Sequence, residues 1–115
     1  MRKVRFKLGS SDLKKIIDYL TDNYDLDFIY ENHSNDMSIL ASEDLYLRTG
    51  SYQFNMIIGK IENEHIIIDV IGGAGGTGLL NISWGSEKSY TKKVKIILRN
   101  YVEESNLTFE EIESL

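Results

Sequence analysis

Cysteine and proline are both missing from this chain of 115 residues, and each absence narrows what the protein can be. Without cysteine there are no disulfides, no Cys-ligated metals and no thiol chemistry. Without proline, the turns must be built from Gly, Asn, Asp and Ser. Histidine occurs only twice, which leaves little room for ordinary acid–base or catalytic-triad chemistry.

Long apolar runs and an excess of positive charge are missing as well. The longest apolar runs, such as 66–68, are far too short to span a bilayer, and no run of signal-peptide length follows the basic residues 1–5. The formal net charge is −5, whereas nucleic acids and anionic membranes attract positive surfaces. We therefore expect a soluble cytoplasmic protein that binds neither nucleic acid nor membrane.

The residues that are present have the composition of one globular domain, with 42% hydrophobic and 27% charged side chains. A stripe at helical spacing, Leu13, Ile16, Ile17 and Leu20, predicts a first helix, and residues 87–104 predict a long second one. Apolar and polar residues that alternate, or a short apolar run, predict strands. These predicted strands cover 2–8, 25–31, 37–48 with a break at 42–44, 52–58, 65–71 and 79–84.

The predicted element order is β-α-β-β-β-β-β-α, and a run of strands after one helix favours antiparallel meander pairing. We predict an α+β fold in residues 1–105, with a single antiparallel sheet of five to six strands and two helices on one face. Such an arrangement is similar to the helix-grip and TATA-binding-protein-like folds. Residues 106–115 are expected to form an acidic tail or a short, loosely docked helix, because Thr108-x-x-Glu111 resembles a capping box. Their removal should then cost little stability.

Five of the nine glycines lie within residues 72–78, and Gly73 to Gly78 match the pattern G-x-G-x-x-G. A dinucleotide fingerprint also needs a helix that begins at the loop, but residues 79–84 are predicted to form a strand. The loop is not a Walker loop either, since no Lys-Ser/Thr follows its last glycine. A structural hairpin or bulge is the favoured interpretation. The alternative is a ligand loop whose backbone at Gly75 and Gly76 binds an anion.

Asp69 is the most anomalous residue, because it lies within an otherwise apolar strand. A buried carboxylate needs a partner or a raised pKa, so Asp69 is a candidate general base or ligand-binding acid. Alternatively, it points to solvent or pairs with Arg48 or a lysine of a neighbouring strand. Glu62, Glu64 and His65 lie nearby in sequence, but His65 and Asp69 are about 13 Å apart along an extended strand. We therefore predict no metal site and no cofactor.

Two further groups of side chains have a structural and a functional interpretation. Tyr30 and Phe54, at strand spacing with Tyr52, are predicted to be core residues, with the lining of a ligand pocket as the alternative. Lysines and an arginine form a basic stripe on the long helix, which predicts a solvated helix face. On an acidic chain, such a stripe is more typical of a protein partner than of DNA. Its residues are Lys88, Lys92, Lys95 and Arg99.

Residues 72–87, Gly-Gly-Ala-Gly-Gly-Thr-Gly-Leu-Leu-Asn-Ile-Ser-Trp-Gly-Ser-Glu, resemble the signature of a family of short bacterial proteins of unknown function. In that family a strand leads into a glycine-rich turn, an Asn-x-x-Trp-Gly segment and a long C-terminal helix. Glu43-x-x-Tyr46-x-Arg48-x-x-Ser51 is a second, weaker match. The resemblance implies a single bacterial α+β domain and supplies no activity, cofactor or catalytic residue. The acidic tail departs from the family pattern.

We therefore predict a non-catalytic module that binds a small ligand or a protein, with a homodimer through an open sheet face or edge as one such arrangement. A ligand module should hold a pocket of at least ~300 Å³ between sheet and long helix, lined by Tyr30, Phe54 or Tyr101. An interaction protein should have that space filled and an apolar patch exposed. The alternative is a small carboxylate-dependent enzyme, in which Asp69 meets Glu43, Arg48 or a histidine in a sheet–helix cleft.

Overall fold

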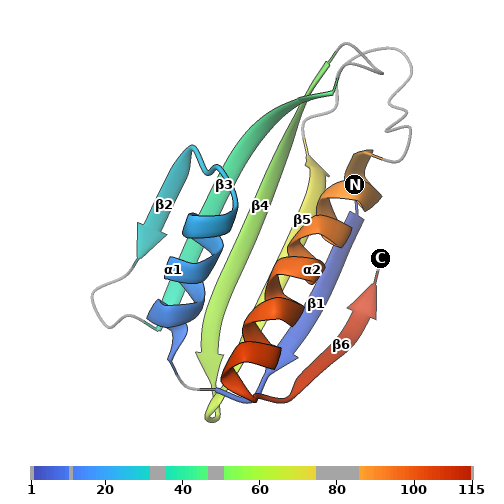
Figure 1. The fold of residues 1–115 in the computed structure, drawn as a ribbon. Coiled ribbons are helices and arrows are strands. Elements are labelled where there is room, and N and C mark those ends of the chain that lie inside the picture. Colours follow the sequence, from blue (N-terminus) through green and yellow to red (C-terminus); the bar gives the residue numbers. More distant parts are fainter. Residues whose placement is uncertain (1, 11, 32–35, 47–50, 75–85, 115) are drawn as a thin grey trace.

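The computed structural model describes residues 2–10, 12–31, 36–46, 51–74 and 86–114. This part of the chain forms six strands and two helices (Figure 1). In chain order, the elements are β1 (Arg2–Leu8), α1 (Leu13–Asn23), β2 (Phe28–Glu31), β3 (Met37–Tyr46), β4 (Ser51–Glu62), β5 (His65–Ala74), α2 (Ser86–Ser105) and β6 (Phe109–Ser114).

All six strands belong to one sheet in the order β2-β3-β4-β5-β1-β6, and every neighbouring pair is antiparallel. The meander β2 to β5 fills most of the sheet, and the N-terminal strand β1 lies between β5 and β6. β4 and β5 are joined at Asn63 and Glu64, whose φ angles of 50° and 65° build a two-residue hairpin turn. Both angles match a type I′ turn, which suits the twist of adjacent strands.

Both helices lie on the same side of the sheet (Figure 1). α1 begins at Asp12, whose side chain accepts a hydrogen bond from the Lys15 backbone N–H at 3.2 Å. Its predicted stripe is confirmed, because Leu13, Ile16, Ile17 and Leu20 are all buried. From α2 the core receives Tyr90, Val94, Leu98, Tyr101 and Val102.

Strand alternation sends every second side chain into this core. On β5, Ile66, Ile68 and Val70 are fully buried beneath the helices, and Phe6 and Leu8 of β1 pack beside them. The side chains between them, such as Asp69 and Arg5, therefore point to the opposite face of the sheet. The two described helices therefore cover one face of the sheet and leave the other uncovered.

The fold class predicted from the sequence is confirmed: an α+β domain with one antiparallel sheet and two helices on one face. The break predicted at 42–44 is wrong, because β3 runs continuously from Met37 to Tyr46. The strand predicted at 79–84 lies outside the described residues. Among the described helices, none is long and apolar enough to cross a membrane.

The C-terminal residues correct another prediction, since 109–114 form the edge strand β6 and not a tail or short helix. α2 ends in a Schellman turn: Asn106 adopts a φ of 55°, and the Leu107 N–H donates to the Val102 carbonyl at 2.9 Å. This turn leads the chain back along β1, where the Phe109 ring stacks on Phe6 with centroids 5.2 Å apart. The described elements therefore run β-α-β-β-β-β-α-β.

Candidate functional site

The face of the sheet that neither α1 nor α2 covers, called here the open face, carries a largely apolar surface. Its orientation follows from the strand registers, because residues paired directly across antiparallel strands point to the same side. Its apolar side chains include Phe28, Tyr30, Met37, Ile39, Ala41, Phe54, Met56, Ile58, Ile67, Ile71 and Ile112. The charged ones include Lys3, Arg5, Lys7, Glu43, Lys60, Asp69 and Glu110.

Exposed large apolar residues collect on this face. Among the described residues, seven such side chains are exposed, and five of them lie here: Phe28, Tyr30, Met37, Phe54 and Ile112. Phe28 is 55% exposed and Tyr30 is 48% exposed. Single exposed apolar residues are ordinary, but a contiguous group rimmed by charges marks an interaction surface.

The open face is divided into an apolar half and a charged half. One row across the strands pairs Tyr30, Ile39, Ile58, Asp69 and Arg5 in succession. Its first members, on β2, β3 and β4, are apolar, and its last, on β5 and β1, are charged. The half over β2, β3 and β4 is therefore mostly apolar, although it also carries Glu43, Lys60 and Glu62, and the half toward β1 and β6 is mostly charged.

Asp69 forms an ion pair with Arg5 across the β1–β5 ladder. Arg5 Nε donates to Asp69 Oδ1 at 2.6 Å, and Arg5 Nη2 donates to Oδ2 at 3.0 Å. The Asp69 side chain is 11% exposed and that of Arg5 is 30% exposed. Both carboxylate oxygens are therefore engaged by one guanidinium, in the bidentate geometry that makes such pairs strong and specific. Pairing with a cation was one of the alternatives predicted for Asp69; the partner that the structure shows is Arg5 and not a lysine, and Arg48 lies outside the described residues.

The sheet–helix cleft predicted for a carboxylate enzyme does not contain Asp69, because this residue points to the open face. His65 lies four residues away, about 13 Å along the strand, and its Nδ1 lies 2.9 Å from the Asn63 carbonyl. Glu43 belongs to a different cross-strand row, opposite Phe54. Within the described ranges, no three His, Asp or Glu side chains gather as metal ligands.

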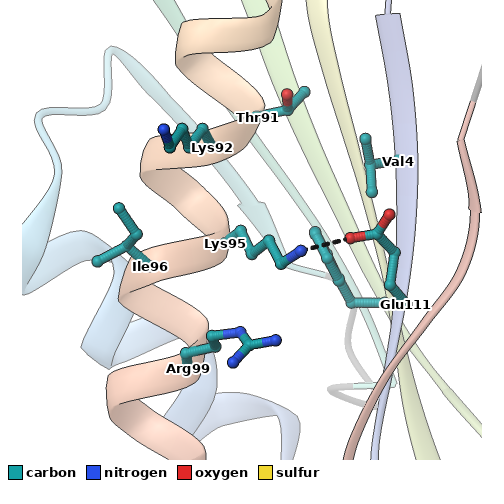
Figure 2. Close-up of a pocket in the computed structure, with 8 residues that line it drawn as sticks. Val4, Thr91, Lys92, Lys95, Ile96, Arg99 and Glu111 are labelled. Carbon is teal, nitrogen blue, oxygen red and sulfur yellow. Dashed lines mark hydrogen bonds and ion pairs between the residues drawn. The ribbon is translucent and has the colours of Figure 1, made fainter.

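A second site-like feature is a groove of about 380 Å³ beside α2, on the helix-covered side of the sheet. It arises because α2 covers β5 and β1 but leaves β6 beyond its edge (Figure 1). Lys95 reaches across it to Glu111 of β6, with Nζ and Oε1 2.8 Å apart (Figure 2). The groove is lined by Val4, Phe6, Thr91, Lys92, Lys95, Ile96, Arg99 and Glu111.

This groove meets the size expected of a ligand pocket between sheet and long helix, but its lining differs from the prediction. Tyr30 and Phe54 lie on the opposite face of the sheet and line no part of it. Tyr101 is 8% exposed and belongs to the core. The basic stripe does border the groove through Lys92, Lys95 and Arg99, so it is not a purely solvated helix face.

The sequence-predicted site residues are only partly brought together. Tyr30 and Phe54 are exposed on the open face, so their assignment to the core is wrong. Asp69 shares that face but lies on β5, about three strand spacings or ~14 Å from Tyr30 on β2. Arg48, Gly75 and Gly76 lie outside the described residues.

Arg5 and Phe28 are the participants that sequence reasoning missed. Arg5 alternates with apolar residues on its strand, and nothing in this local pattern identifies Asp69, 64 positions away, as its partner. Phe28 belongs to the run Phe28-Ile29-Tyr30, which places aromatic residues on one face of a short edge strand. An edge strand with exposed aromatic residues was the available signal for an interaction surface.

Comparisons of the chain with family models, with curated proteins and with solved structures found no match. The resemblance of residues 72–87 to a family of short bacterial proteins stays a prediction.

Proposed function

We propose that this protein is a non-catalytic binding module whose open face packs against the open face of a second copy. The observation that carries the proposal is the concentration of exposed apolar side chains on that face, in five of the seven cases among the described residues. Burying such a surface is favourable at about 25 cal/mol per Å² of apolar area, although ordering and lost translational freedom offset part of the gain.

The size of the face supports a stable dimer. Strands about 4.8 Å apart and residues about 3.4 Å apart give a six-stranded face of roughly 600 Å² before side chains roughen it. Stable interfaces bury about 800 Å² of accessible surface per partner, and a corrugated face exposes more than its flat area. An open face that meets its own copy is therefore large enough.

The charge pattern supports a second copy as the partner. The whole chain carries a net charge of −5, which would oppose self-association through most of its surface. On the open face, however, Lys3, Lys7 and Lys60 are balanced by Glu43, Glu62 and Glu110, and Asp69 is neutralised by Arg5. A two-fold axis that lies between the two sheets, parallel to them and above β3 and β4, would place the apolar half of each copy on that of the other.

The alternative function, a carboxylate-dependent enzyme, receives less support from the geometry. A general base needs a free lone pair within reach of a substrate proton. Asp69 instead directs both oxygens to Arg5 and stands apart from His65 and Glu43. We propose a bacterial, cytoplasmic setting for the module and no nucleic-acid partner, on the sequence arguments given above.

The proposal is tested by the molar mass in solution, measured by light scattering and sedimentation over a wide concentration range. We expect a dimer, and we expect Tyr30→Lys and Phe54→Lys each to weaken it by at least tenfold, because a lysine would be buried in an apolar contact. Ile29→Lys is the matched control: Ile29 lies on the same edge strand, is 49% exposed, and points to the other side of the sheet.

Two outcomes would contradict the proposal. One is a wild-type protein that stays monomeric at the highest concentration reached. The other is a dimer that Ile29→Lys disrupts as strongly as Tyr30→Lys, which would indicate pairing through the β2 edge and not through the open face.

A further inference from the structure

The groove between α2 and β6 is separate from the open face, and its chemistry points to a different kind of partner. It lies on the helix-covered side of the sheet, whereas Tyr30 and Phe54 lie on the other side. We infer that this groove binds a single-chain amphiphile with a carboxylate head, of the class of a medium-chain fatty acid. The inference does not depend on self-association.

The floor of the groove is apolar. Val4 and Phe6 of β1 line it, and both belong to the hydrophobic core with exposures of 3% and 0%. Both side chains border the groove although they are almost fully buried, and Ile96 of α2, which is 52% exposed, adds apolar surface to the lining. An alkyl chain placed there would extend the existing core, which is the interaction that small-molecule pockets mostly supply.

The walls of the groove are cationic. Lys92, Lys95 and Arg99 border it, against a single carboxylate from Glu111. Lys95 is engaged by Glu111, whereas Lys92 and Arg99 form no ion pair with any side chain that the structure describes. The guanidinium of Arg99 lies over the Phe109 ring, 5.7 Å from its centroid, which fixes this cation beside the apolar floor. In Figure 2, Lys95 and Arg99 leave α2 on the side that faces Glu111 and Val4.

Glu111 already places one carboxylate against the cationic wall of the groove, at Lys95. Its carboxylate lies 2.8 Å from Lys95 Nζ, although both side chains are more than one-third exposed. Exposed ion pairs of this kind contribute little stability and exchange easily. A ligand carboxylate can therefore bind Arg99 beside this pair or replace Glu111 at Lys95. Because Glu111 competes with such a ligand, its removal should strengthen binding.

The volume limits the ligand to one chain. About 380 Å³ is near the lower end of the ~300–1,000 Å³ found for small-molecule sites. A phospholipid with two acyl chains exceeds it, whereas a medium-chain carboxylate with its head at the solvent-exposed rim does not. The proposed ligand is thus a free carboxylate and not a membrane lipid.

The test is a titration of the ¹⁵N-labelled full chain with decanoate below its aggregation concentration, followed by amide shifts. We expect saturable shifts at Thr91, Lys95, Arg99 and Glu111. Acetate, 1-decanol and decyltrimethylammonium should each bind at least tenfold more weakly, since each lacks the alkyl chain or the negative charge.

Two variants test whether the cationic side chains contribute to decanoate binding beyond apolar contact. Arg99→Gln should weaken decanoate binding about tenfold, and Glu111→Gln should strengthen it several-fold. Lys93→Gln is the matched control, because Lys93 is an exposed lysine of α2 that does not line the groove. A loss of fold alone cannot produce these opposite changes.

Several results would overturn the inference. Equal binding of decanoate and 1-decanol would show that the cations are not used, and equal binding of acetate would show that the floor is not used. Shifts centred on Tyr30 and Ile58 would place the amphiphile on the open face. Tyr30→Lys distinguishes the two proposals: it should weaken the dimer at least tenfold and leave decanoate binding unchanged.

Discussion

Arg5 and Asp69 lie directly opposite one another on β1 and β5, and their side chains form two hydrogen bonds, of 2.6 Å and 3.0 Å. The pair is flanked by apolar residues, with Ile58 opposite Asp69 on β4 and Ile67 two positions along β5. It therefore joins the N-terminal strand to the central hairpin and forms the border between the apolar and charged halves of the open face. Asp69 is best explained as a structural acid.

A structural role for Asp69 predicts a specific pattern of stabilities. Asp69→Asn should lower the free energy of unfolding by about 1–3 kcal/mol, because it removes the carboxylate that accepts both hydrogen bonds from the partly buried Arg5 guanidinium. The double variant Arg5→Leu, Asp69→Leu should recover part of that loss, since the partly buried guanidinium is removed together with the carboxylate. Urea unfolding at one fixed low protein concentration measures both. An Asp69→Asn protein as stable as wild type would contradict the assignment.

Gly59 of β4 lies close beneath side chains of α1. A Cβ atom added at this buried position would lie 3.0 Å from Leu13 Cδ1 and 3.2 Å from Ile68 Cδ1. Gly59→Ala should therefore destabilise the fold by about 1–3 kcal/mol through overpacking. Combining it with Leu13→Val, which shortens the facing side chain, should cost less than the sum of the two single changes. Thermal and urea unfolding test this, and strict additivity would mean that the contact does not limit the space.

The strand β6 contributes to stability, contrary to the expectation for a loosely docked tail. Phe109 stacks on Phe6, and Leu107 packs against the core at the turn after α2. Phe109→Ala should cost about 2–3 kcal/mol, a reduced value for a ring that is only partly buried. Glu110→Ala, an exposed neighbour on the same strand, should change stability by less than about 0.5 kcal/mol. Equal, small effects of the two changes would show that β6 is not docked.

Local patterns in the sequence were sufficient for most of the fold. The helical stripe of α1 and the alternation in β1 each follow from a period that a short stretch displays by itself, and a short apolar run is enough to indicate β5. The turn at Asn63 and Glu64 is also indicated by its polar residues, which lie between two apolar runs. The order of strands in the meander then follows, because consecutive antiparallel strands tend to be neighbours.

The exposure of the open face and the strand β6 could not be predicted from local patterns, because both depend on contacts between residues far apart in the sequence. The pattern 109–114 becomes a strand because β1 offers a free edge and Phe6 offers a ring to stack on, both about a hundred residues away in sequence. Likewise, Tyr30 and Phe54 have the spacing of core residues, and only the placement of both helices on the other side leaves them exposed. Periodicity shows that a strand has an apolar face but not whether a helix covers it.

Tyr19 gives the contact between α1 and α2 a dependence on pH. Its hydroxyl donates to Glu104 Oε1 at 3.5 Å, and its ring meets Tyr101 edge-on. Partial burial raises the pKa of the Tyr19 phenol above its ordinary value of 10.0, and the Glu104 carboxylate raises it further. The folded state therefore favours the neutral phenol, a contribution that is complete below pH ~10 and lost as the pH rises through the raised pKa.

Tyr19→Phe should remove this part of the alkaline destabilisation. We expect the difference in Tm between wild type and Tyr19→Phe to be constant from pH 7 to about 9 and to shrink above ~10. Comparing the two proteins cancels the titration of the lysines and of the other tyrosines. A difference that does not change with pH would show that the phenol titrates alike in the folded and unfolded chain.

The β4–β5 hairpin places a residue with a side chain where glycine is favoured. Glu64 adopts a φ of 65°, and the left-handed region costs roughly 1 kcal/mol for most residues with a Cβ. Asn-Gly is the preferred pair for this turn, and Asn63 already occupies its first position. Glu64→Gly should therefore raise the free energy of unfolding by up to about 1 kcal/mol, after part of the gain is lost to the greater freedom of glycine in the unfolded chain.

The control for this prediction is Glu62→Gly, two residues earlier at the end of the paired strand. Because Glu62 pairs with His65 in the ladder, glycine there should lower stability by about 0.5–1 kcal/mol. The two changes remove the same side chain from the same hairpin, so their opposite signs would isolate the backbone conformation as the cause. A loss of stability with Glu64→Gly would mean that the Glu64 side chain contributes more than its left-handed backbone costs.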